Sequence, residues 1–586
     1  MALGMILLAA CLWADPLGRL FTGAFDRALA ARSPTSAPVE QDPLAVLDPG
    51  SQPPEQVRLV CHRVLSEPPG NHHDAYVMLD QVADETTVPV LIGSLKWLTR
   101  DVCTESHCLD LLRYLCNVDL GDDHDTWRHW WEQNRHNTRR DWLLAGFGRA
   151  GLPASTPPDP PFVVALLKTA CDKRPFLARN SPAFLASSVP LPTLATVVRQ
   201  HLRSADTDVK RGVALILRRV ELPGRLDLLR QLWQDRSPGV ASTALTVHND
   251  VVRGQLRSGS TGPVARAWPV SGEELTWVSA PDSSRLVLGA GRKVIGFDPL
   301  SGKELWQHFC AEYTAVGSLL VEGRLLVRDG AGTVYGLDPA TGRQLLTRRV
   351  PGWSQDCGLG IVPLGRGRIV VSGNRSVCAV DLTTGGLAWT VDCSPCEDAV
   401  CWCRGSVHVA TTDGAPLRIS AGGRVARERT RIPDVHGLVG ADDGLFVTHS
   451  TRDDCWISRI DPSDHRTIWK TRAGRCWSRL RPGPVLVGDA VVVGSGDTLA
   501  TLDRKTGAVR WAITREYDHG PYAAGRLVAA YARGPALELF RIETGELVWS
   551  SENVNIHGRP LAFLPGTIFT PGRGRGLLAI RTGNGR

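Results

Sequence analysis

The sequence contains no run of five or six Lys or Arg residues, and its arginines are scattered along the chain. A basic stripe of the kind that binds nucleic acid is therefore not indicated. The sequence also lacks the Gly-x-Ser-x-Gly motif of serine hydrolases, and it contains no other hydrolase, kinase or nucleotide-binding motif. The motifs consequently give no support to catalysis by an activated serine or to phosphoryl transfer.

The apolar stretch at the N-terminus, residues 2–14 of "MALGMILLAACLWAD", is too short to span a bilayer as a helix, which needs about 20 residues. Its length suits the apolar region of a secretory signal, although no Lys or Arg precedes it. The segment from Leu8 to Cys11 also resembles the lipobox of bacterial lipoproteins, which would make Cys11 a lipidation site. We expect export on these grounds. A misassigned start codon and an apolar helix are the alternatives.

The overall composition is typical of a soluble globular protein with several domains. Of the 586 residues, 43% are hydrophobic and 22% are charged, and the net charge is +7. Fifteen cysteines are many for a cytosolic protein, but their spacings do not indicate a small disulfide-framework domain. The chain also contains 18 tryptophans, several of which recur at a fixed spacing.

Two kinds of segment precede the middle of the chain. Residues 15–55 are expected to form a flexible linker, because 33–55 is rich in Pro and Ser and has no apolar periodicity. From 56 to 257 apolar residues recur at helical spacing, and short polar or proline-containing breaks separate the helices. This organisation predicts a HEAT-like α-solenoid of stacked helical hairpins. One clear helical stripe is formed by Val209, Val213, Ile216, Leu217 and Val220.

A tryptophan-rich string, "GDDHDTWRHWWEQNR" (121–135), lies within this helical region. If Asp125 caps the helix, the three tryptophans Trp127, Trp130 and Trp131 fall on one face. The string resembles a short motif that closes HEAT-like regions in some bacterial multidomain proteins. We favour an amphipathic helix whose indoles enter the core. A metal site is the alternative, with ligands from Asp122, His124 and His129.

The second half of the chain repeats one phrase, in which an Asp is followed by Thr-Gly or Ser-Gly and, eight residues after the Asp position, by Trp. The Trp is present in five of the six clear copies, and Leu346 replaces it in the other. A decayed copy lies at 416–426, and a partial copy ends the chain with Arg581 at the Asp position. Together these copies define eight units of about forty residues. The clear copies are 294–306, 334–346, 377–389, 457–469, 499–511 and 537–549.

Each unit also contains short strand-like segments separated by turn signals, as in "LLVEGRLLVRDGAGTVYGLD". Eight such units predict an all-β, eight-bladed β-propeller over 265–586. Trp268 precedes the first complete copy, so we expect the start of this region to complete the blade that the C-terminus begins. We interpret the phrase as structural, with Asp and Gly forming a turn and Trp a wedge between blades. The residues assigned to this blade motif are Asp298, Gly302, Trp306, Asp338, Gly342, Asp381, Gly385, Trp389, Asp461, Trp469, Asp503, Gly507, Trp511, Gly545 and Trp549.

The phrase resembles the Ala-x-Asp-x-x-Thr-Gly-x-x-x-Trp blade motif of the pyrroloquinoline-quinone-like (PQQ-like) propeller superfamily. That superfamily includes quinoprotein dehydrogenases, which bind the quinone and calcium, and non-enzymatic members such as the lipoprotein of the outer-membrane β-barrel assembly machinery. The enzymes enclose the cofactor with long insertions, and many place a disulfide between adjacent cysteines above it. Here the steps are too even for such insertions, and no Cys-Cys dipeptide occurs. We therefore expect no cofactor.

The cysteine cluster "CSPCEDAVCWCRG" contains Cys393, Cys396, Cys401 and Cys403. Four thiolates could hold zinc, but the usual pattern places twelve or more residues between two Cys-x-x-Cys pairs. Cys401 and Cys403 would lie on one face of a strand and could fill space in the core. Unpaired structural thiols, a disulfide and a metal site all remain open.

The sequence favours a non-catalytic scaffold that binds other proteins and is exported or attached to the cell envelope. Two alternatives remain: a quinoprotein oxidoreductase with quinone and calcium, and a carbohydrate- or small-ligand-binding propeller. The expected partners are proteins and not nucleic acid, and membrane contact is expected only through a lipid on Cys11. A cytoplasmic location is the alternative to the envelope.

Overall fold

The computed structural model describes residues 44, 47, 52–67, 72–97, 102–258, 264–270, 275–282, 284–314, 317–351, 360–427, 431–432, 434–451, 454–475, 483–532, 536–551, 561–564, 566–572 and 576–581. The predicted signal segment with Cys11, and most of the predicted linker, lie outside these residues. Both therefore stay predictions.

The chain forms two compact units, Met1–Gly151 and Leu152–Arg586. The second unit contains several helices together with the whole propeller. The helical domain predicted over 56–257 stays a prediction. The last helix of this region is bonded to the propeller, and side chains of one helix that bond to strands far along the chain leave no mark in local periodicity.

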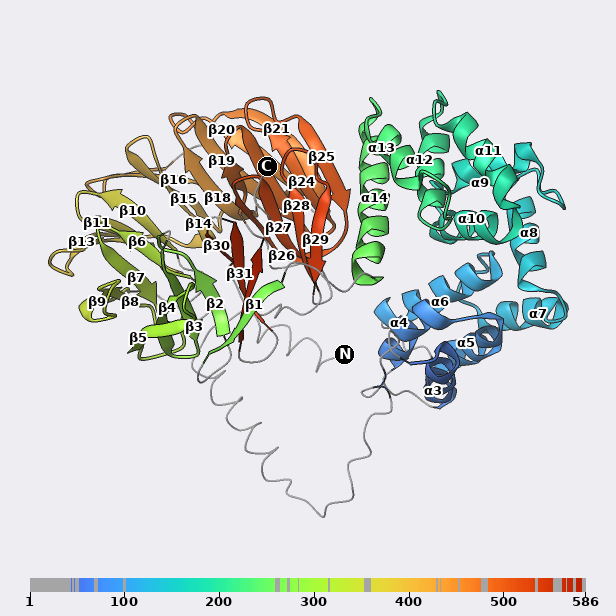
Figure 1. Cartoon of the computed structure of the whole chain (residues 1–586), viewed down its shortest axis with the longest axis horizontal. Helices are drawn as coiled ribbons and strands as arrows, with labels where there is room; N and C mark the ends of the chain where they lie inside the picture. Colours follow the sequence, from blue (N-terminus) through green and yellow to red (C-terminus); the bar gives the residue numbers. More distant parts are fainter. Residues whose placement is uncertain are drawn as a thin grey trace, which may run out of the picture. The chain divides into compact units, whose positions relative to one another are not determined.

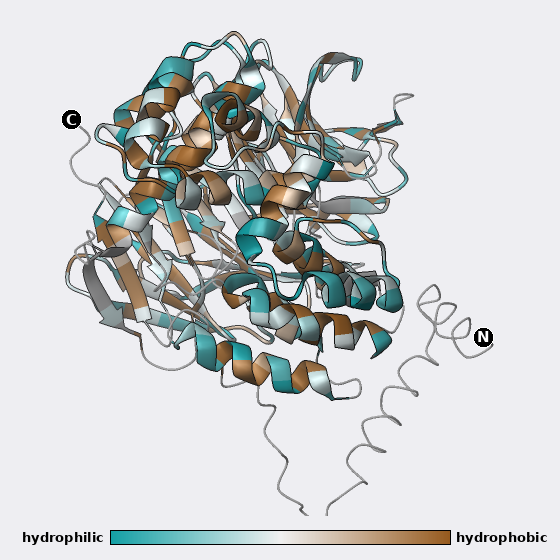
Figure 2. Cartoon of the chain, turned by 90° about the vertical axis from the view of Figure 1, so that its right-hand side faces the viewer, coloured by the Kyte–Doolittle hydropathy of each residue, from teal (hydrophilic) through white to brown (hydrophobic). Residues whose placement is uncertain are grey.

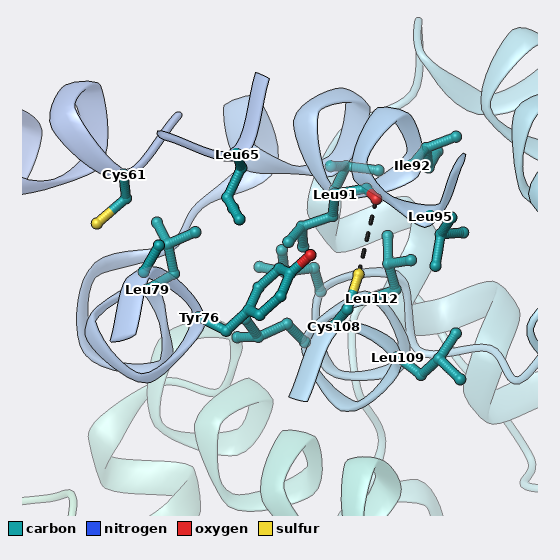
Figure 3. Packing of buried hydrophobic residues seen from close by; sticks show 14 of the residues in the cluster. Cys61, Leu65, Tyr76, Leu79, Leu91, Ile92, Leu95, Cys108, Leu109 and Leu112 are labelled. Carbon is teal, nitrogen blue, oxygen red and sulfur yellow. Dashed lines mark hydrogen bonds between the residues drawn. The ribbon is translucent and has the colours of Figure 1, made fainter. Parts of the chain in front are cut away.

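The described part of the first unit is helical, and its helices enclose one apolar core (Figure 3). Tyr76 is buried in this core and donates a hydrogen bond from its hydroxyl to Ser94 Oγ at 2.9 Å. The thiol of Cys108 lies 3.7 Å from the Leu91 carbonyl oxygen. The α-helices of this unit are α3 (Pro54–Ser66), α4 (His72–Val82), α5 (Val88–Ser94), α6 (Val102–Cys116), α7 (His124–Asn134) and α8 (Arg139–Arg149), and two 3₁₀ turns are Glu85–Thr87 and Leu95–Trp97.

The helices of the second unit precede its strands. The stripe predicted at 209–220 forms, and its apolar residues on α12 are buried. This helix begins after Asp206, whose carboxylate accepts the backbone N–H of Asp208 at 2.9 Å. The helices are α9 (Pro160–Thr169), α10 (Pro175–Ser188), α11 (Leu191–His201), α12 (Thr207–Leu217), α13 (Arg225–Trp233) and α14 (Pro238–Ser258).

The helical region predicted from sequence is therefore confirmed, with twelve α-helices among the described residues. The finer prediction, a HEAT-like solenoid, stays a prediction. The helices carry both hydrophobic residues (brown) and hydrophilic residues (teal) in Figure 2, as expected when each helix buries one face. Within the described residues, no helix combines the length and apolar character needed to cross a membrane.

Eight four-stranded antiparallel sheets follow, and they confirm the predicted eight-bladed propeller (Figure 1). In blades 1 to 7 the strands pair in chain order, so the fourth strand is the outer edge. The blades are: blade 1, β2 (Leu275–Ser279), β3 (Leu286–Ala290), β4 (Lys293–Asp298), β5 (Lys303–Phe309); blade 2, β6 (Leu319–Val321), β7 (Arg324–Arg328), β8 (Thr333–Leu337), β9 (Gln344–Arg349); blade 3, β10 (Ile361–Gly365), β11 (Arg368–Ser372), β12 (Ser376–Asp381), β13 (Leu387–Asp392); blade 4, β14 (Pro395–Cys403), β15 (Ser406–Thr411), β16 (Leu417–Ser420), β17 (Val425–Arg427); blade 5, β18 (Val435–Ala441), β19 (Gly444–Thr451), β20 (Asp454–Ile460), β21 (Thr467–Arg475); blade 6, β22 (Val485–Val487), β23 (Ala490–Ser495), β24 (Thr498–Asp503), β25 (Val509–Thr514); blade 7, β26 (Tyr517–Ala524), β27 (Leu527–Ala532), β28 (Ala536–Arg541), β29 (Leu547–Ser551).

Blade 8 is built from both ends of the propeller region. Its strands β30 (Ala562–Leu564), β31 (Thr567–Pro571) and β32 (Gly576–Arg581) come from the C-terminus, and its outer strand is β1 (Val264–Pro269). Trp268 of β1 pairs with Leu577 of β32 and stacks on Phe569 of β31. The prediction that the start of this region completes the last blade is confirmed.

Candidate interaction surfaces

The repeated Asp and Gly residues form a hydrogen-bonded turn between the third and fourth strands of a blade. In blade 2, Asp338 Oδ1 accepts the backbone N–H groups of Ala340 and Thr341, each at 2.9 Å. The hydroxyl of Thr341, followed by these amides, lowers the pKa of the Asp338 carboxyl. Gly342 closes the turn at φ +67°, a conformation that costs glycine little. Asp298, Asp381, Asp461 and Asp503 occupy the same turn position in blades 1, 3, 5 and 6.

The closing tryptophan of one blade lies on the turn of the next. Trp306 of blade 1 is seated on Gly342, where an added Cβ would lie 2.4 Å from the indole ring. Its Nε1–H donates to the Pro339 carbonyl at 3.1 Å. The same seating joins Trp268 to Gly302, Trp389 to Gly423, Trp469 to Gly507 and Trp511 to Gly545, while Leu346 lies against Gly385 and Trp549 joins the apolar cluster that extends into blade 8. These contacts connect consecutive blades.

The turn of blade 5 departs from this arrangement. His465 stands where the other turns have glycine, adopts φ +55°, and is buried. Blade 4 has no tryptophan to cover that turn. His408 of β15 reaches across from blade 4, and its Nδ1 lies 3.1 Å from Nε2 of His465. Sequence reasoning missed this histidine pair, although the change from Gly to His at position 465 was a visible signal.

The cysteine cluster is divided between two environments. Cys401 and Cys403 are buried, free thiols in an apolar cluster with Val435 and Leu438 of blade 5. Cys393 is a half-buried free thiol that packs against the cluster between blades 3 and 4. Burial raises the pKa of the Cys393 thiol to about 11. The side chain of Cys396 lies outside the described residues, so the zinc, disulfide and space-filling interpretations stay open.

The tryptophan-rich helix α7 buries Trp127, and its Nε1–H donates to the Gly121 carbonyl at 2.9 Å. Trp130 and Trp131 are half-buried, and both rings contact Trp142 of α8 edge to face. One expectation was wrong. Asp125 does not cap the helix, because Asp123 holds that position.

The Asp123 carboxylate accepts the backbone N–H of Thr126 at 2.7 Å. The three residues proposed as an alternative metal site are not gathered. His129 is exposed and bonds to Gln133, while His124 bonds to Asp125. Across all of the described side chains, there is no group of three or more His, Cys, Asp and Glu that could hold a metal ion.

Helix α14 lies against the outer strands of blades 6 and 7, β25 and β29 (Figure 1). Ser242 Oγ donates to the Ala512 carbonyl at 2.9 Å, and the Thr514 N–H donates to Thr246 Oγ1 at 3.1 Å. Both backbone groups belong to β25, the outermost strand of blade 6. The helix therefore satisfies backbone groups that an edge strand otherwise leaves unpaired.

The same helix bonds to the turn of blade 7. Asn249 is buried, donates from Nδ2 to the Gly545 carbonyl at 2.9 Å, and accepts the Leu547 N–H at Oδ1, also at 2.9 Å. Leu245 is fully buried between these polar contacts and packs with Trp511. The four docking residues Ser242, Leu245, Thr246 and Asn249 have the i, i+3, i+4, i+7 spacing of one helix face.

A buried ion pair between Arg253 of α14 and Glu538 of β28 completes this contact, which we call the α14 seam. Arg253 Nε donates to Glu538 Oε1 at 2.6 Å, and Nη2 donates to Oε2 at 3.2 Å. Burial disfavours the charge of Arg253, but Glu538 and Asp250 outweigh it and raise the pKa of the guanidinium. Arg515 lies 3.3 Å from Glu538 on another side. The buried carboxylate of Glu538 thus helps to position the helix on the sheet.

Sequence reasoning missed the whole docking face of α14. In the sequence its residues indicate only a helical stripe with small polar side chains. Their hydrogen-bonding partners are backbone atoms about 270 to 300 positions away. Backbone partners leave no signature in the sequence.

A shallow groove is also present in the first unit. It is lined by residues of α3 and by Thr86, and includes Leu59, whose side chain is 69% exposed. His62 in this groove bonds from its ring to Thr87 Oγ1 at 3.1 Å, and burial lowers its pKa. A single histidine engaged with a structural hydroxyl does not form a catalytic arrangement.

A family model matches most of the propeller region. Residues 290–431 and 453–586 match the family model for the outer membrane protein assembly factor BamB. No curated protein matches the chain. Two crystal structures are among the similar folds: BamB from Moraxella catarrhalis, 16% identical, covering 55% of this chain and 99% of its own with a TM-score of 0.42, and the computationally designed Ika8 protein, 14% identical, covering 53% and 98% with a TM-score of 0.42.

The family-model match and the eight four-stranded sheets identify the C-terminal region as a PQQ-like β-propeller. It is preceded by a helical region of twelve described α-helices.

Proposed function

We propose that this protein is a non-catalytic scaffold of the cell envelope, which binds other proteins through its propeller and its helices. The observation that carries the proposal is the seam at α14. There the outer edge of the propeller holds an α-helix through backbone hydrogen bonds, an apolar anchor and a buried ion pair. The propeller thus already acts as a receptor for a protein element, within its own chain.

Two observations support the envelope as its location. The family model that matches the propeller describes an outer membrane protein assembly factor. Cys455 is disulfide-bonded, and disulfides persist in oxidising compartments such as the bacterial periplasm. The predicted signal segment and lipidation of Cys11 agree with this location.

Native mass spectrometry of the full chain purified from its own host, with metal analysis of the same sample, tests the proposal. We expect the mass of the polypeptide, with or without a lipid on Cys11, and additional species whose extra mass is that of a protein. Quinone and calcium bound at stoichiometry would contradict the proposal and support an oxidoreductase. A bound sugar would support the ligand-binding alternative.

A further inference from the structure

The outer edge of blades 1 and 2 has the features of the edge that α14 covers, but no described element covers it. On β5, Leu305 is 49% exposed and Phe309 is 63% exposed, and on β9 Leu345 is 42% exposed. Several large exposed apolar side chains on neighbouring outer strands mark interaction sites more often than single exposed residues do.

The backbone of β5 is also oriented as in the covered edge. The Cys310 N–H donates to the Arg292 carbonyl at 2.9 Å, so Phe309 and Gln307 direct their backbone groups away from the sheet. In blade 6, the Arg515 N–H bonds to the Asp497 carbonyl in the same way, and Ala512 and Thr514 are the residues bonded by α14. Gln307 and Phe309 thus stand where a docked helix finds its backbone partners.

The contact between blades 1 and 2 is also equivalent to the contact between blades 6 and 7. Trp306 on Gly342 corresponds to Trp511 on Gly545, the pair against which Leu245 of α14 is buried. The two edges differ in charge. The edge of blades 1 and 2 carries Lys303, Arg343 and Arg349, which are exposed, and among the described residues none forms an ion pair with them.

We propose that the outer edge of blades 1 and 2 binds an acidic amphipathic helix of a partner protein, in the way that blades 6 and 7 bind α14. The helix would place Leu or a similar residue between Leu305 and Leu345 and would present small hydroxyl or amide side chains to the β5 backbone. Its flanking Asp and Glu residues would face the three cations. This inference specifies the partner chemistry of the proposed function and rests on that function.

Site-specific photocrosslinking in the native host tests the inference on the full chain. The photoreactive residue p-benzoylphenylalanine replaces Phe309 or Leu345, and a matched control replaces Ile468, an exposed residue of β21 in blade 5 (45% exposed). We expect crosslinks from positions 309 and 345 that map, by mass spectrometry, to one acidic amphipathic helix of another protein. The control position should not capture this helix.

A synthetic peptide of the mapped helix then gives the affinity by fluorescence anisotropy. Leu305→Glu is expected to weaken binding at least tenfold, while Ile468→Glu leaves it unchanged, and Arg343→Glu with Arg349→Glu should remove most of the salt dependence. Circular dichroism of each variant shows whether it is folded.

Several results would overturn the inference. Crosslinks that map to an extended strand, to a second copy of this chain or to lipid, or crosslinks at position 468 alone, would contradict it while leaving the scaffold function intact. The absence of crosslinks at all three positions, together with a native mass spectrum free of protein partners, would reject both the inference and the scaffold function.

Discussion

His465 shows how a single departure from the blade motif is accommodated. A histidine in place of glycine leaves a backbone with positive φ and a ring that must be buried. The ring is buried, and Nδ1 of His408 lies 3.1 Å from its Nε2. Cys401 and Arg418 are the cross-strand neighbours of His408 on β14 and β16.

This pair makes the stability of the propeller sensitive to acid. Burial, and then the neighbouring His465, lower the pKa of His408 from 6.5 to about 4. Between pH 6.5 and about pH 4, the unfolded chain therefore protonates His408 more readily than the folded chain does. The contribution of the neutral ring is therefore complete above pH 6.5 and is lost as the pH falls towards 4.

We expect His408→Gln to reduce the loss of unfolding free energy between pH 7 and pH 4.5 by up to roughly 2 kcal/mol, because glutamine cannot bind the proton. Urea denaturation at the two pH values measures this change. An equal acid sensitivity in His408→Gln and the wild type would contradict the role of the pair.

Trp306 tests the wedge between blades. Trp306→Ala should lower the unfolding free energy by roughly 3–5 kcal/mol, because it removes a large side chain from a close-packed seat. Trp306→Phe keeps most of the apolar contact and loses the bond to the Pro339 carbonyl, which costs about 1 kcal/mol. Calorimetry of the full chain gives both values. If Trp306→Ala had no effect, the contact of Trp306 with Gly342 would not contribute to stability.

At the scale of elements, the contact of α14 with the propeller depends on a buried ion pair. Arg253 and Glu538 are both buried, so removal of one partner leaves the other charge buried with only Asp250 or Arg515 beside it. We expect Arg253→Met or Glu538→Gln alone to destabilise the second unit by roughly 3–5 kcal/mol.

The double variant Arg253→Met/Glu538→Gln should cost less than the sum of the two single changes, because the interaction between the two side chains is lost only once. A double-mutant cycle by calorimetry checks this coupling. Additive losses would mean that the two side chains do not interact and that other contacts hold α14 in place.

The contrast between the blades and α14 explains what the sequence could predict. Each blade repeats the same turn and the same wedge, so Asp, Gly and Trp recur at fixed spacing. The propeller and its eight units could therefore be predicted from the sequence. The stripe on α12 was readable because it is buried locally. The docking face of α14 and the edge at Leu305 and Phe309 depend on which backbone groups of a distant blade remain unpaired. Only the assembled sheet shows this.

At the scale of the whole molecule, ring closure depends on one strand. The chain leads from β1 directly into blade 1, so the ring is closed within blade 8, where β1 pairs with β32 and Trp268 stacks on Phe569. Trp268 also contacts Phe297 and Gly302 of blade 1. We expect Trp268→Ala to speed the exchange of amide hydrogens in β1 and β32 far more than Trp306→Ala affects β5 and β8. Equal effects would show that closure does not depend on this contact.

The central claim is that one outer edge of the propeller is covered by a helix of its own chain, while a matching edge stays open for a partner. Hydrogen exchange of the isolated full-length protein, resolved to single amides, tests it most directly. We expect slow exchange at the amides of Thr514 and Leu547, which bond to Thr246 and Asn249, and fast exchange at Gln307 and Phe309. Fast exchange at all four amides would show that α14 does not cover blades 6 and 7, and slow exchange at Gln307 and Phe309 would show that the edge of blades 1 and 2 is already occupied.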